Sequence, residues 1–109
     1  MRTSALDPFG LRLDVDLAAV VADSSALAVL VSELRALLAE HGVVVARGQA
    51  LDDDGFTTLL RGFGDLVFTE GETPLEGHPD LNVISNVGRS TPPRSVFHVD
   101  TSYVSRPPA

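Results

Sequence analysis

The feature that most constrains this chain is a stripe of aliphatic residues at helical spacing. They recur three or four positions apart and so share one face of a helix: Leu27, Leu30, Val31, Leu34, Leu37 and Leu38. We expect Ser24 or Ser25 to begin this helix and His41 to end it, with Gly42 as the glycine after the last turn. One apolar face of this length requires another element to pack against.

Strands are predicted on both sides of that helix. Residues 9–17 carry apolar side chains at every second position (Phe9, Leu11, Leu13, Val15 and Leu17), which predicts a strand with one buried face. The short apolar run 43–45 predicts a second, buried strand. An aspartate of the run 52–54 is expected to cap a second helix, which presents Phe56, Leu59, Leu60 and Phe63 and ends at Gly64.

The remainder of the chain reads as strands and loops. Residues 69–80 are rich in Gly, Pro and Glu and are interpreted as a long irregular loop, and loops of that length are usually functional. Alternation predicts a strand over 81–87, a loop over 88–94 and a last strand over 96–100. The order predicts an α+β fold in which two helices pack on an incomplete, mainly antiparallel sheet.

Composition narrows the possible partners. The 109 residues carry a formal charge of −7, with eight Arg and no Lys, so nucleic acid and anionic membranes are not expected partners. There is no Cys, which excludes disulfides, thiolate metal sites and Cys nucleophiles and fits a cytoplasmic location. The length suits one domain, and the absence of Lys suggests a bacterial gene. A small-molecule substrate is the expected partner.

The most informative candidate site is the segment Phe97-His98-Val99-Asp100. In a strand, side chains two positions apart project from the same face, so His98 and Asp100 are expected to point together. An imidazole nitrogen and a carboxylate oxygen side by side can chelate one divalent ion. Two His and one carboxylate form the facial site of non-heme Fe(II) oxygenases. By itself His-x-Asp is a weak signal, which a surface His beside a solvated Asp also explains.

Several further stretches, in a fixed order, strengthen that interpretation. They are Glu40-His41-Gly42-Val43-Val44-Val45-Ala46-Arg47-Gly48-Gln49, Arg61-Gly62-Phe63-Gly64-Asp65-Leu66, His78-Pro79 with Val83-Ile84-Ser85-Asn86, and Phe97-His98-Val99-Asp100-Thr101-Ser102-Tyr103 with Arg106-Pro107-Pro108-Ala109. Together they cover nearly the whole chain. The sequence resembles the taurine dioxygenase / TfdA-like family of Fe(II)- and 2-oxoglutarate-dependent dioxygenases.

The resemblance implies a double-stranded β-helix, or jelly-roll, fold with His98 and Asp100 as two of three iron ligands. Fe(II) would be the cofactor, with 2-oxoglutarate and O2 as co-substrates. In the family, the distal His ligand, an Arg that pairs with 2-oxoglutarate and a Thr that seats it all lie C-terminal to the His-x-Asp motif. We therefore expect residues 1–109 to be a single partial domain, the N-terminal part of a longer catalytic domain, and inactive alone. Its exposed sheet edges would favour homo-oligomers.

The same resemblance suggests where substrate binds. In the taurine enzyme a His and a Tyr contact the substrate at positions that correspond here to Thr69 and Glu72, so taurine is a doubtful substrate. Arg94 replaces a family Asn and would meet a carboxylate, and Tyr103 would stack in the pocket, although the default explanations are a solvated Arg94 and a Tyr103 packed under the sheet. These residues suggest a small organic acid or an amino-acid-like substrate. His41, at a helix end, and His78, in the predicted loop, are expected to be structural.

Two other functions remain open from the residues alone. A truncated relative that serves as a non-catalytic binding or assembly module would keep the helix-and-strand half without completing a metal site. A zinc hydrolase that uses His98 and Asp100 lacks a visible third ligand and a general base.

Overall fold

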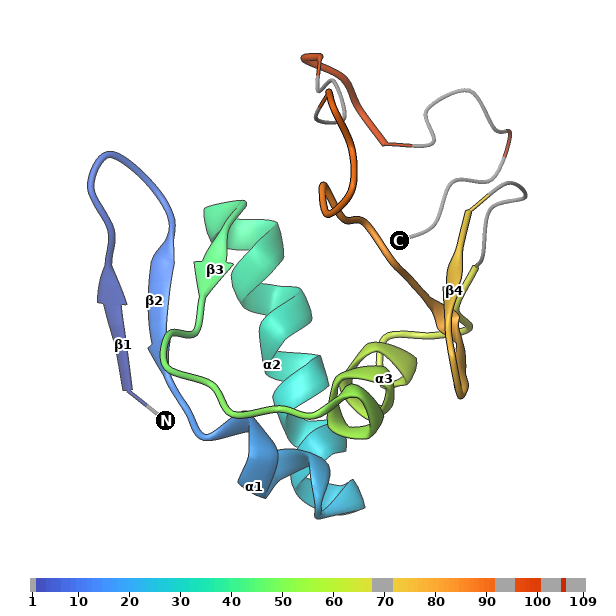
Figure 1. Cartoon of the computed structure of the whole chain (residues 1–109). Helices are drawn as coiled ribbons and strands as arrows, with labels where there is room; N and C mark the ends of the chain where they lie inside the picture. Colours follow the sequence, from blue (N-terminus) through green and yellow to red (C-terminus); the bar gives the residue numbers. More distant parts are fainter. Residues whose placement is uncertain (1, 68–71, 92–95, 101–104, 106–109) are drawn as a thin grey trace. The chain divides into compact units, whose positions relative to one another are not determined.

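The computed structural model describes residues 2–67, 72–91, 96–100 and 105 (Figure 1). The chain forms two compact units, residues 1–65 and 66–109. Within the described residues the fold is α+β, with helices in the first unit and strands in both. Among those residues no helix is both long enough and apolar enough to cross a bilayer.

The first unit contains a small mixed sheet. Strand β1 (Arg2–Ala5) pairs antiparallel with β2 (Leu11–Asp14), and β2 pairs in parallel with β3 (Val44–Val45), in the order β1-β2-β3. The strand predicted over 9–17 is therefore too long at both ends. Phe9 lies in the turn before β2 and is 66% exposed, and Asp16 caps the next helix instead of continuing the strand.

In the described part of this unit there are three helices, and each begins directly after an aspartate that caps its N-terminus. They are α1 (Leu17–Val21), α2 (Ser24–His41) and α3 (Asp53–Arg61), capped by Asp16, Asp23 and Asp52. Each cap carboxylate accepts backbone N–H groups that have no partner inside the helix. The predicted limits of α2 are confirmed, with Gly42 following at a φ of 74°. Helix α1 was not predicted, and α3 ends at Arg61, before the expected Gly64.

The core of the first unit lies where α1 and α2 meet β2. Leu13, Leu17 and Leu30 form its buried centre, and Leu13 is only 2% exposed. Residues of β3, of the segment after it and of α3 complete the cluster, among them Val44, Leu51 and Leu59. The alternation of β2 and the stripe of α2 thus face the same interior, as binary patterning predicts.

The side chain of Gln49 joins two distant segments of this unit. Its Oε1 accepts the Leu17 N–H at 2.8 Å, while Nε2 donates to the carbonyls of Val15 at 2.8 Å and Arg47 at 2.9 Å. The amide therefore supplies hydrogen-bond partners to backbone groups between β2 and α1. It also links that segment to the turn after β3. A carboxamide is needed because it both donates and accepts.

Helices α2 and α3 approach closely at Gly62. A Cβ on this residue would lie 2.8 Å from Cγ2 of Val31, whose side chain is buried. Beside this contact, Arg35 of α2 donates a hydrogen bond to the Phe63 carbonyl and lies over the Phe63 ring, 5.5 Å from its centroid. The end of α3 is thus fixed to α2 by close packing and by a cation over an aromatic face.

The second unit contains a β-hairpin. Strands β4 (Pro74–Leu75) and β5 (His78–Asn82) pair antiparallel around a turn at Glu76 and Gly77. The irregular loop predicted over 69–80 is therefore wrong from residue 74 onward. The strand predicted over 81–87 starts earlier and stops at Asn82, since residues 83–86 have no strand pairing.

We predict that Gln49→Leu destabilises the first unit. The substitution leaves the Leu17 N–H and two carbonyls without their partner, at a cost of about 1–3 kcal/mol. Urea unfolding followed by circular dichroism measures the change. Arg47→Leu, in the same turn but with an exposed side chain, is the control and should shift stability by less than about 0.5 kcal/mol. Equal effects of the two variants would contradict the role given to the amide.

We also predict that the effect of Gly62→Ala on the free energy of unfolding depends on the residue at position 31. Because Gly62 has helical dihedral angles, Ala gains helix propensity there, yet its Cβ overlaps Val31 and the net effect is a loss of about 1–2 kcal/mol. In a Val31→Ala background the overlap disappears, and Gly62→Ala should become neutral or stabilising. Urea unfolding of the four proteins in this double-mutant cycle measures the coupling. Additive effects of the two substitutions would refute the close approach.

Candidate metal centre

A bend in the chain brings His98 and Asp100 together. Nε2 of His98 lies 2.7 Å from Oδ1 of Asp100. The strand predicted over 96–100 is wrong, because this segment bends at Phe97 and turns at Asp100. A strand requires a hydrogen-bonded neighbour, and the described residues supply none to this segment. The expected proximity of the two side chains is found, although strand alternation does not produce it.

The other ring nitrogen of His98, Nδ1, is hydrogen-bonded to the backbone. Its Nδ1–H donates to the Val96 carbonyl oxygen at 2.5 Å. Histidines that bind metals usually donate one ring N–H to a carbonyl or carboxylate, which fixes the tautomer and directs the other nitrogen at the ion. Val96 was not identified from the sequence, and no side-chain motif could identify it, since its carbonyl makes the contact.

These two contacts change the proton affinity of the ring. They raise the pKa of His98 above its ordinary value of 6.5, first through the Val96 carbonyl and then through the hydrogen bond and negative charge of Asp100. Both nitrogens donate when the ring is protonated, and the structure supplies an acceptor for each. A metal ion at Nε2 must therefore displace a proton that Asp100 favours.

The two side chains carry donor atoms of the kinds that divalent metal ions accept. Two ligand atoms that occupy adjacent positions, each about 2.1 Å from an ion, lie about 3.0 Å apart. The observed 2.7 Å between Nε2 and Oδ1 is a direct hydrogen bond, so an ion would have to replace the shared proton, and both side chains would have to turn toward it to reach that separation. The side chains of His98 and Asp100 are 56% and 90% exposed, so an ion reaches both without any rearrangement of a core.

No third donor joins the pair in the described part of the chain, where no group of three metal-ligating side chains is found. Glu72 lies on an exposed segment just before β4. The other three residues proposed to bind substrate, Thr69, Arg94 and Tyr103, lie outside the described residues.

The remaining histidines lie on regular elements. His41 occupies the last turn of α2, as expected, with Nε2 3.8 Å from a carboxylate oxygen of Glu40. A ring at a helix C-terminus is favoured by the helix dipole when it carries charge. His78 belongs to β5 and not to a loop, which corrects its predicted setting.

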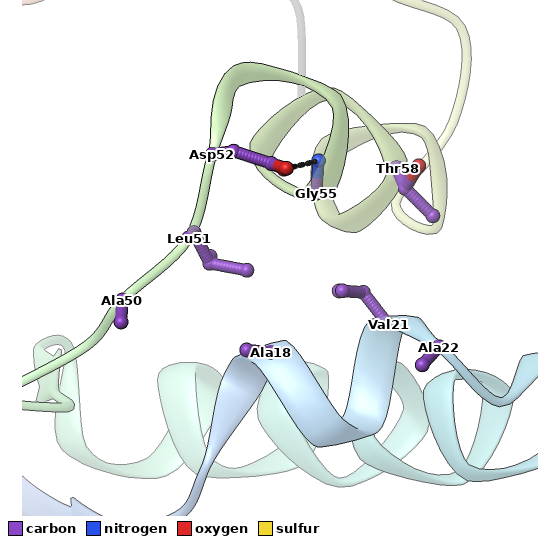
Figure 2. A pocket seen from close by; sticks show the side chains of 8 residues that line it. All are labelled: Ala18, Val21, Ala22, Ala50, Leu51, Asp52, Gly55 and Thr58. Carbon is purple, nitrogen blue, oxygen red and sulfur yellow. Dashed lines mark hydrogen bonds between the residues drawn. The ribbon is translucent and has the colours of Figure 1, made fainter.

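A cavity of about 350 Å³ lies between α1 and α3 in the first unit (Figure 2). Its walls include the small side chains of Ala18, Ala22 and Ala50, and Val21 and Leu51 project toward each other across it. The carboxylate that lines it, Asp52, accepts the Gly55 N–H at 2.7 Å. That carboxylate is already used as the cap of α3, so the cavity offers packing space and not a second set of ligands.

A comparison with models of protein families identifies the family of this chain. The family described as "Taurine catabolism dioxygenase TauD, TfdA family" matches residues 2–109. The chain belongs to this family, whose members are generally dioxygenases that use Fe(II) and 2-oxoglutarate. No curated protein and no solved structure matches the chain.

We predict that His98 titrates above pH 6.5 in the metal-free chain. The pKa of His98 is raised because its contacts stabilise the protonated ring, so the contact with ionised Asp100 is strongest while the ring is protonated and weakens as the pH rises through that pKa. Asp100→Asn should lower the titration midpoint without abolishing the shift, since the Val96 carbonyl remains. Proton NMR of the ring measures both values. A midpoint at or below 6.5 in the unaltered chain would contradict the described contacts.

Proposed function

We propose that this chain supplies two of the three iron ligands of an Fe(II)- and 2-oxoglutarate-dependent dioxygenase. The ligands are Nε2 of His98 and a carboxylate oxygen of Asp100. The observation that carries the proposal is their separation of 2.7 Å, with the far nitrogen of the ring bonded to the Val96 carbonyl. Family membership supports the choice of Fe(II) and 2-oxoglutarate over other metals and co-substrates.

In this proposal the metal ion and its co-substrates carry out the oxidation, and the chain holds the metal ion. Fe(II), with 2-oxoglutarate and O2, supplies the oxidising power when it is bound. His98 contributes a neutral nitrogen donor whose direction is set by the Val96 carbonyl. Asp100 would contribute a carboxylate oxygen donor, whose negative charge would offset part of the charge of the metal ion. The two side chains would thereby hold the metal ion in place before substrate arrives.

The third ligand and the Arg that binds 2-oxoglutarate are proposed to lie outside residues 1–109, as part of a complete jelly-roll domain. The high exposure of His98 and Asp100 supports this, since an oxidising site must exclude water. It is also supported by the lack of a three-donor cluster in the described segments. On this proposal the 109-residue chain alone is inactive, and the complete enzyme works in the cytoplasm.

The proposed substrate is a small organic acid or an amino-acid-like molecule. On the resemblance, Thr69 and Glu72 would correspond to the substrate-binding His and Tyr of the taurine enzyme, so we propose a substrate other than taurine. Arg94 is proposed to meet a carboxylate and Tyr103 to stack beside it. The exposed position of Glu72, near the β-hairpin, is compatible with contact to a ligand.

A second candidate function is a non-catalytic binding or assembly module. The observation that favours it is the same lack of a third donor among the described residues. Such a module would associate with other copies through the outer edges of β1 and β3, each of which has a strand partner on one side within the described sheet.

Anaerobic dialysis against Fe(II) distinguishes the two functions. We expect the chain to bind Fe(II) weakly, and His98→Ala or Asp100→Ala to lower the affinity by at least about tenfold, because each removes one of two ligands. His41→Ala is the matched control and should bind like the unaltered chain. Fe(II) binding that is unchanged by both ligand substitutions would contradict the metal site and favour the module.

Adding 2-oxoglutarate to the same samples tests the position of the missing ligands. We expect no visible charge-transfer band and no consumption of 2-oxoglutarate by residues 1–109. Turnover by this chain would contradict the proposal that the third ligand lies elsewhere. It would do so without affecting the assignment of His98 and Asp100.

A further inference from the structure

We draw no further inference here: the strongest candidate, the cavity of about 350 Å³ between α1 and α3, rests on the N-terminus of α3 alone, because Asp52 already caps that helix and no second feature of the described residues points to a ligand.

Discussion

The burial of one face of α2 against β2 and α1 is the contact on which the first unit depends. Leu30 meets Leu13 and Leu17 there, and residues from β3 and α3 close around them. Since β2 and β3 pair through only two residue pairs, the sheet alone is too small to be stable, and it needs the apolar face of the helix packed against it. Gln49 and Gly62 serve the same packing, one by satisfying backbone groups at its edge and the other by allowing close approach.

The sequence predicted the parts of the fold that local patterns determine. Helix α2 has the predicted limits because its stripe and the following Gly42 agree. The hairpin of the second unit was missed because Pro74, Gly77 and Pro79 resemble loop residues, yet an edge strand of a two-stranded hairpin tolerates proline. The last predicted strand failed for the opposite reason. Alternation at Phe97 to Asp100 describes a strand only where a neighbour pairs with it, and a single sequence does not reveal neighbours.

In the candidate site, too, some contacts could be predicted from the sequence and others could not. The pair His98 and Asp100 is visible as a motif, and family membership gives it a chemical context. The Val96 carbonyl, which orients the ring, depends on the local bend and carries no side-chain signature. In the structure the ring is hydrogen-bonded to the Val96 carbonyl through Nδ1 and to Asp100 through Nε2, and we propose that an ion takes the place of the second hydrogen bond.

The central claim is that Nε2 of His98 and Asp100 bind one metal ion while Nδ1 stays bonded to Val96. The most direct measurement is the ¹⁵N spectrum of the His98 ring during titration with Zn(II), a diamagnetic substitute for Fe(II). The account predicts a coordination shift at Nε2, with Nδ1 still protonated, and loss of that shift in Asp100→Ala at the same metal concentration. Coordination through Nδ1, or a ring spectrum that does not respond to the metal, would contradict it.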